Sequence, residues 1–137
     1  MVKMIFVDTA AFIALIDEKE EGHLAVCKVF QNEFSASVKF FTSDYVLDEV
    51  LTLLRCREKQ SLEKVFVFIQ SIEIADVQIL AVTKEVFGVS MKFMKNHLEA
   101  YYSFTDCTSF VLMKSLKIKD VLTTDKHFRT AGFNILI

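Results

Sequence analysis

The chain contains no proline, no tryptophan and only three glycines among its 137 residues. Glycine and proline most often mark linkers and low-complexity segments, so their scarcity predicts one domain over residues 1–137 without an internal linker. No apolar run reaches the roughly 18 residues that a membrane-spanning helix needs. We therefore expect a globular protein that does not cross a membrane.

Cysteine is scarce as well, and its pattern argues against two classes of small protein. The chain has an odd number of cysteines, which lie far apart in the sequence and form no CxxC motif: Cys27, Cys56 and Cys107. This is typical of reduced thiols and not of a disulfide framework or a zinc knuckle. The apolar start of the chain is similar to a signal peptide, but Asp8 interrupts it and no small-residue cleavage site follows. A cytoplasmic location is expected.

The chain also lacks an excess of positive charge. Its 16 Lys and Arg residues against 18 Asp and Glu residues leave a net charge of −2, which argues against nonspecific coating of nucleic acid. A nuclease is not excluded, because bound metal ions would offset a cluster of acids. The 14 phenylalanines and a mean hydropathy of +0.36 favour a buried interface as well as a core, although a phenylalanine-rich core alone explains them equally well.

Strand-like and helix-like segments alternate along the chain. Apolar runs predict strands at residues 4–7, 38–42, 74–80, 121–123 and 133–137, and longer segments predict helices at 9–16, 23–34, 44–57, 62–72, 83–95, 105–116 and 126–131. Ser43 or Asp44 and Ser61 are expected N-caps. The alternation predicts an α/β fold whose mainly parallel sheet is covered on both faces. The helix at 62–72 is apolar nearly all round, so it is expected to be buried on both sides or to lie in an interface.

Four acids stand where such a fold can gather them. Asp8 and Asp125 follow predicted strands, Asp106 lies at a predicted helix start, and Glu49 lies near the edge of an apolar helical stripe. Sites in parallel sheets form beyond the carboxyl ends of the strands. Acids gathered in one pocket repel each other unless cations lie between them. Because oxygen ligands favour hard cations, a Mg²⁺ or Mn²⁺ site is expected rather than a zinc site.

Each acid also has a simpler explanation. Asp8 and Asp125 could be N-caps of the helices that follow them. Asp106 could complement a helix dipole. Glu49 could belong to a buried ion pair, but no Lys or Arg lies three or four residues away on its helix to provide one. The metal-site hypothesis depends on the four acids acting together.

Four segments, in this order and spacing, resemble the PIN domain family, particularly the toxin nucleases of the VapC type. They are Phe6-Val7-Asp8-Thr9, Val46-Leu47-Asp48-Glu49-Val50, Ser103-Phe104-Thr105-Asp106-Cys107 and Leu122-Thr123-Thr124-Asp125-Lys126-His127-Phe128. The resemblance covers nearly the whole chain, and the ordered set is more specific than any single segment. It implies a three-layer α/β/α sandwich with a central, mainly parallel five-stranded sheet. Cys107 departs from the family pattern, in which a small residue is usual.

The resemblance implies that Asp8, Glu49, Asp106 and Asp125 are catalytic and hold Mg²⁺ or Mn²⁺, with Thr9 and Thr123 as supporting polar residues. It further implies an endoribonuclease that hydrolyses RNA phosphodiester bonds, acts as a toxin, forms a homodimer and is blocked by a cognate antitoxin. Basic side chains near this site are expected to contact RNA phosphates, or else to be ordinary surface charges: Arg55, Arg57, Lys126, His127 and Arg129.

Other functions compete with this interpretation. A non-catalytic binding module would keep the fold and hold a partner with its apolar helices. A housekeeping RNA-processing nuclease would use the same acids. A phosphoryl-transfer α/β protein fits poorly, because a receiver domain would have paired acids after its first strand and a dehalogenase-like phosphatase would have a second Asp where Ala10 stands.

Overall fold

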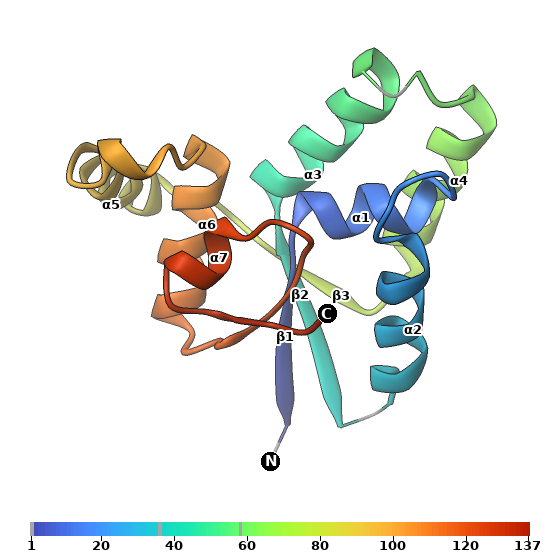
Figure 1. Ribbon diagram of the computed structural model, residues 1–137, viewed down its shortest axis with the longest axis horizontal. Helices are drawn as coiled ribbons and strands as arrows, with labels where there is room; N and C mark the ends of the chain where they lie inside the picture. The colour runs from blue at the N-terminus through green and yellow to red at the C-terminus, as the bar shows by residue number, and fades with distance from the viewer. Residues whose placement is uncertain (1, 36, 58) are drawn as a thin grey trace.

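The strands of the chain form one parallel sheet in the order β3-β2-β1-β4-β5, seen in the computed structural model of Figure 1, which describes residues 2–35, 37–57 and 59–137. All the pairings in this sheet are parallel. The strands are β1 (Lys3–Val7), β2 (Val38–Ser43), β3 (Val77–Leu80), β4 (Asp120–Leu122) and β5 (Asn134–Ile135). The predicted five-stranded α/β fold is confirmed, with a sheet that is wholly rather than mainly parallel.

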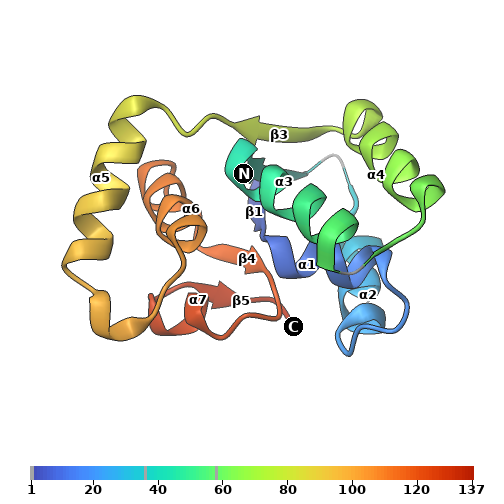
Figure 2. The same ribbon diagram turned by 90° about the horizontal axis from the view of Figure 1, so that it is seen from above.

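Helices cover both faces of this sheet, as the view from above shows (Figure 2). Helices α1, α2 and α4 lie on one face and α5 and α6 on the other. The helices are α1 (Thr9–Ile16), α2 (His23–Glu33), α3 (Asp44–Thr52), α4 (Leu62–Ile74), α5 (Lys84–Lys95), α6 (Phe104–Ser115) and α7 (His127–Thr130). A π-helical turn, η1 (Leu53–Arg57), continues α3, and a 3₁₀ turn, η2 (Leu98–Ala100), follows α5.

Hydroxyl side chains begin four of these helices. In each case the side chain accepts a hydrogen bond from a backbone N–H three residues later, which satisfies a donor that the first helical turn leaves free. The residues are Ser43, Ser61, Thr83 and Ser103. The caps expected at Ser43 and Ser61 are confirmed.

In three regions the predicted boundaries are wrong by more than one residue. Helix α4 continues to Ile74, and its last turn is closed by the Ala75 N–H donating to the Ser71 carbonyl, so strand β3 begins only at Val77. The helix predicted at 44–57 stops at Thr52 and becomes the π-helical turn η1. Strand β5 is limited to Asn134–Ile135. Short apolar runs fit a strand or a helix end equally well, so their periodicity alone does not place these boundaries.

Phenylalanine rings fill the core on both faces of the sheet. On one face Phe12 of α1 meets Phe68 of α4 edge-on, with ring centroids 5.5 Å apart. On the other, Phe110 of α6 is fully buried and packs against the rings of Phe128 at 4.9 Å and Phe133 at 5.6 Å. Much of the phenylalanine content therefore builds the core, which both explanations include, and an additional interface remains a prediction.

Helix α4 is not buried on both sides. Only Val65 and Phe68 are buried in it, whereas five large apolar side chains of the same helix are exposed: Leu62, Phe66, Val67, Ile69 and Ile74. The interface alternative for this helix remains a prediction. Within the described ranges no helix has the length and apolar character required to cross a bilayer.

Candidate active site

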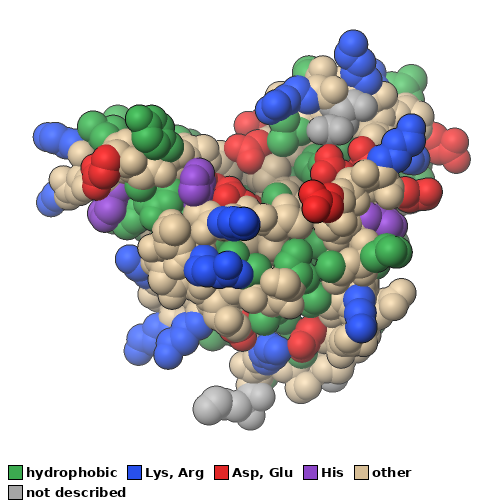
Figure 3. All heavy atoms as spheres, in the orientation of Figure 1, with side chains coloured by type: hydrophobic (Ala, Val, Ile, Leu, Met, Phe, Trp, Pro, Cys, Tyr) green, Lys and Arg blue, Asp and Glu red, His purple; other side chains and the backbone are tan. Residues whose placement is uncertain are grey.

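A cavity of about 520 Å³ opens at the edge of the sheet where the strands end. The four predicted acids all line it and come from different parts of the chain: Asp8 follows β1, Glu49 belongs to α3, Asp106 to α6, and Asp125 precedes α7. In the space-filling view, acidic side chains border the hollow between α5 and the end of α3 (Figure 3). The tertiary structure thus brings together all four acids.

Asp8 does not serve as a helix cap. It occupies the N-cap position of α1, but its side chain makes no capping bond. Its Oδ2 instead accepts a hydrogen bond of 2.9 Å from the Thr123 hydroxyl, and the residue is only 3% exposed. Burial and the neighbouring charge of Asp106 raise the pKa of Asp8 to about 7. Hydrogen bonds from Thr123 and the Thr9 backbone favour the carboxylate and oppose this rise.

Thr123 connects two of the acids. While its hydroxyl donates to Asp8, the same oxygen accepts a hydrogen bond of 3.0 Å from the backbone N–H of Asp125. Thr123 itself is fully buried. A single buried hydroxyl therefore positions the carboxylate after β1 relative to the loop after β4, and the supporting role of Thr123 in the site stays a prediction.

Asp106 has two functions in the structure. With Ser103 it forms a capping box: its N–H donates to the Ser103 hydroxyl, and its Oδ2 accepts from the Ser103 N–H at 3.2 Å. The simpler explanation therefore holds in part. The same Oδ2 also lies 3.4 Å from Nδ1 of His127. Burial and the charge of Asp125 raise the pKa of Asp106, and the contacts to Ser103 and His127 oppose this rise.

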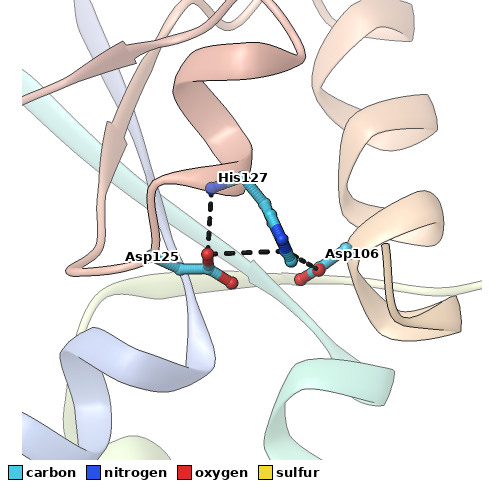
Figure 4. Close-up of side chains that lie close together, drawn as sticks. All are labelled: Asp106, Asp125 and His127. Carbon is cyan, nitrogen blue, oxygen red and sulfur yellow. Dashed lines mark hydrogen bonds and ion pairs between the residues drawn. The ribbon is translucent and has the colours of Figure 1, made fainter. Parts of the chain in front are cut away.

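Asp125 holds His127 in place and so shapes the centre of the site. Its Oδ1 accepts a hydrogen bond of 2.9 Å from the His127 N–H and lies 3.6 Å from the ring Nδ1. Figure 4 shows the imidazole pointing between the carboxylates of Asp106 and Asp125. One ligand atom from each of these three residues lies within 4.8 Å of the others. This spacing would allow the three residues to share a cation.

Glu49 is half-buried and lines the same cavity, outside this compact group of three. The buried ion pair that could have explained it is not seen: among the described residues, no lysine or arginine forms an ion pair with any of the four acids. Within the described residues, hydrogen bonds from Thr123 and Ser103 and the neighbouring His127 ring, rather than lysine or arginine, offset part of the repulsion among these acids.

Thr9 carries a polar atom without a partner. Its hydroxyl oxygen is buried and makes no hydrogen bond within the described part of the chain, and the residue lines the acidic cavity. A buried hydroxyl that makes no hydrogen bond is costly. An unused oxygen beside clustered carboxylates fits a cavity built to receive a cation and its water molecules.

The five basic residues proposed as RNA contacts divide into two groups. Arg57 and His127 line the cavity. Arg55 donates to the Gln60 carbonyl at 3.1 Å, and the exposed Lys126 and Arg129 lie outside the cavity lining. The sequence predicted only an RNA contact for His127, although its position two residues after Asp125 was a signal that it would lie near that carboxylate.

Glu20 and Tyr101 are among the lining residues that were not predicted. Glu20 lies in the loop between α1 and α2, and Tyr101 follows η2. Neither carries a local sequence signal, because only the packing of distant segments brings these loops to the ends of the strands.

Gly22 makes close contact with the loop that carries Asp125. A Cβ atom at position 22 would lie 2.6 Å from Cγ2 of Thr124. We expect Gly22→Ala to displace this loop, weakening Mn²⁺ affinity about tenfold and lowering the free energy of unfolding by about 1 kcal/mol. Calorimetric titration and urea unfolding measure the two effects.

Gly88→Ala is the matched control, because a Cβ atom there would meet nothing within 4 Å. In the interior of α5 this change should raise stability by roughly 0.5–1 kcal/mol and leave Mn²⁺ affinity unchanged. Equal Mn²⁺ affinity for Gly22→Ala and the parent protein would contradict the role assigned to the Gly22 contact.

Comparison with known proteins places this geometry in context. A protein-family model, the PIN domain, matches residues 5–134. The 23S rRNA-specific endonuclease VapC20 of Mycobacterium tuberculosis is 30% identical over 132 residues, which cover 95% of each chain. The VapC ribonuclease of Aquifex aeolicus is 23% identical over 135 residues, which cover 95% of this chain and 93% of that protein.

Solved structures give the same result. The crystal structure of Mycobacterium tuberculosis VapC20, described as a sarcin-ricin loop cleaving toxin, matches with a TM-score of 0.82 and 28% identity over 94% of this chain and 95% of that chain. FitAcB from Neisseria gonorrhoeae matches with a TM-score of 0.67 and 15% identity over 98% of this chain and 97% of that chain. At this lower identity the likeness concerns the fold alone.

Proposed function

The chain belongs to the PIN domain family, and from this premise we propose that it is a metal-dependent endoribonuclease that hydrolyses RNA phosphodiester bonds and acts as a toxin. The observation that carries the proposal is the single cavity lined by Asp8, Glu49, Asp106 and Asp125. The names of the relatives support it, since VapC20 is an rRNA endonuclease and the Aquifex aeolicus protein a ribonuclease.

The donor atoms of this cavity fit a hard divalent cation. Five of the lining residues carry carboxylates, and the Thr9 hydroxyl is buried there without a partner among the described residues. Oxygen ligands favour Mg²⁺ or Mn²⁺. Asp106 and Asp125 would hold the ion, with Asp8 and Glu49 completing the site around it. A cation held there would supply activation of a water molecule and positive charge against the scissile phosphate.

The chain's own residues prepare this chemistry. Thr123 orients the Asp8 carboxylate through its hydroxyl and holds the Asp125 backbone through its oxygen. Ser103 fixes the Asp106 carboxylate through the capping box. Electrostatic catalysis depends on charged groups that are held before the substrate arrives, so these bonds limit the reorganisation that cleavage requires.

Arg57 is the basic residue best placed to bind substrate. It ends the π-helical turn η1 and lines the cavity together with Glu49 of the preceding helix α3. A guanidinium there would contact an RNA phosphate as the backbone approaches the acids. Contacts of this kind position the chain of the RNA and do not read its sequence.

The proposal extends to partners and location. A homodimer is supported by the exposed apolar side chains of α4, which a second copy would cover. A cognate antitoxin is proposed because the VapC20 relative is described as a toxin. A cytoplasmic location is supported by three free cysteines, Cys27, Cys56 and Cys107.

Cleavage of RNA by the purified protein tests the proposal. A hairpin with the sarcin-ricin loop sequence and a single-stranded RNA serve as substrates. We expect cleavage in Mg²⁺ or Mn²⁺, none in excess EDTA, and full recovery when the metal is restored above the chelator, because the acids alone offer no charge that stabilises the transition state. Cleavage that continues at the same rate in EDTA would show that the metal-dependent mechanism is wrong.

The toxin role has a separate test. Expression of the parent chain in a bacterial host is expected to arrest growth, and expression of a variant without metal-site acids is expected not to. A chain that cleaves RNA in vitro but leaves growth unchanged would support the housekeeping nuclease instead.

A further inference from the structure

Two adjacent tyrosines at the edge of the acidic cavity lie in opposite environments. Tyr102 is 8% exposed, and its hydroxyl forms a hydrogen bond of 3.0 Å with the Thr130 hydroxyl. Tyr101 is 86% exposed and lines the cavity together with the four acids. An aromatic ring this exposed gains little from folding, so packing does not explain its position.

The backbone of Tyr101 is in an unfavourable conformation. Its φ of 58° and ψ of 30° lie in the left-handed region, which bulky side chains rarely adopt. Residues held in such conformations cluster at functional sites, because the surrounding structure has to enforce them. A glycine would adopt this backbone conformation without strain. The residue found here is instead a tyrosine whose side chain faces the solvent and the cavity.

Both neighbouring segments hold Tyr101 in this position. On its amino-terminal side, the Tyr101 N–H donates to the Leu98 carbonyl of η2. On its carboxyl-terminal side, the Tyr102 ring packs edge-on against Phe110 at 4.9 Å and His127 at 5.4 Å, and Ser103 caps helix α6. The ring is therefore presented by a fixed backbone, which reduces the entropy lost when a ligand stacks on it.

We propose that Tyr101 forms the wall of a nucleobase subsite, on which an unpaired base of the RNA stacks while the adjoining phosphate lies at the acids. This inference rests on the proposed ribonuclease function and adds to it the conformation of the substrate. RNA is recognised largely through unstacked bases of loops and single strands, and these bases stack on exposed aromatic rings. In the same cavity Arg57 would contact the phosphate that follows such a base, and the acids would hold the cation that offsets its charge.

The subsite accepts any base and selects for local single-strandedness. Stacking depends on the π-face that every base has, so it contributes affinity with little sequence preference. A base held within a duplex cannot reach the ring. We therefore expect cleavage positions to lie in loops or single strands, next to a nucleotide that leaves the stack.

Binding of short single-stranded RNA tests the subsite independently of cleavage. Dissociation constants are measured by fluorescence anisotropy in Ca²⁺ for the parent, Tyr101→Ala and Tyr101→Phe, with oligonucleotides in which one nucleotide at a time is abasic. Tyr101→Ala is expected to weaken binding about tenfold, and Tyr101→Phe to bind as the parent does, because stacking requires the ring and not the hydroxyl.

The abasic series separates stacking from a general loss of affinity. One abasic position should weaken binding to the parent about tenfold and should have no further effect on Tyr101→Ala, since both changes remove the same contact. Phe34→Ala is the control: Phe34 is 82% exposed but lies after α2, outside the cavity lining. It should bind RNA as the parent does.

Three results would overturn the proposal: parent-like binding by Tyr101→Ala, an abasic penalty that persists in that variant, or failure of Tyr101→Phe to restore binding. A change in oligomeric state in Tyr101→Ala, measured by light scattering, without an effect on RNA affinity would assign the ring to a protein interface and equally overturn it. If the protein bound RNA but showed no metal-dependent cleavage, the ribonuclease function would be refuted. The RNA affinities of the Tyr101 variants would then still show whether a base stacks on Tyr101. A parent protein that binds no RNA would refute both.

Discussion

Replacing Asp8 by asparagine is expected to slow RNA cleavage by about 100- to 1,000-fold at saturating Mg²⁺ or Mn²⁺. The amide keeps the shape of the side chain and can still accept the hydrogen bond from the Thr123 hydroxyl. It removes one negative charge from a cavity whose proposed task is to hold a divalent cation. The cleavage rate under single-turnover conditions measures the effect, because this rate excludes product release.

Asp48→Asn provides the matched control for this prediction. Asp48 precedes Glu49 on α3 but is exposed and does not line the cavity. The same change of acid to amide should therefore leave the cleavage rate within about twofold of the parent, as expected for a surface charge. If Asp8→Asn cleaved RNA as fast as Asp48→Asn, the acidic site would not be the catalytic centre.

The same Asp8→Asn variant is expected to be more stable than the parent when no metal is present. The pKa of Asp8 is raised from 3.8 to about 7 in the folded chain. Between these values the folded state binds more protons than the unfolded state, so the free energy of unfolding falls as the pH rises from about 4 to about 7. Above pH 7 the destabilisation is complete, and at about 1.4 kcal/mol per pKa unit it amounts to a few kcal/mol.

Urea unfolding in EDTA at pH 5 and pH 8 measures this second effect. The parent should lose stability between the two pH values, whereas Asp8→Asn should lose much less, because the amide does not titrate. Asp106, whose pKa is also raised, contributes a remaining decline of the same sign in both proteins. Saturating Mn²⁺ should raise the stability of the parent at pH 8. An Asp8→Asn variant that is less stable than the parent at pH 8 in EDTA would contradict the buried-charge argument.

Together the two predictions distinguish loss of function from loss of fold. A variant that is inactive because it misfolds would be less stable at every pH. A variant that is inactive because it lacks a charge of the site should be inactive and, without metal, better folded. Functional sites commonly retain this conflict between stability and activity.

Much of the fold follows from local patterns in the sequence. Apolar runs mark the positions of all five strands, and hydroxyl caps such as Ser43 and Ser61 mark helix starts. These signals act over a few residues and need no tertiary partner. The wrong boundaries fall where local evidence is weakest, as at residues 74–76, where an apolar helix end and a strand have the same pattern.

The candidate site likewise has one part that the sequence predicts and another that it does not. Local sequence places Asp8 after β1 and Asp125 after β4, and a parallel sheet turns the carboxyl ends of its strands toward one edge. The sequence therefore puts both acids at the same edge of the sheet, and the pairing of β1 with β4 in the structure makes them neighbours there. What the sequence does not reveal is how they are held, because the Thr123–Asp8 hydrogen bond joins residues that are 115 positions apart.

The sequence by itself determined the fold class, the helix caps at Ser43 and Ser61, and the presence of four acids, three at strand or helix ends and Glu49 within a helix, because each depends on residue type and short-range spacing. Only the tertiary structure decided that His127 lies between Asp106 and Asp125, that Gly22 adjoins Thr124 and that Tyr101 faces the cavity. Side-chain packing between segments remote in the chain sets these contacts, and no local periodicity encodes them.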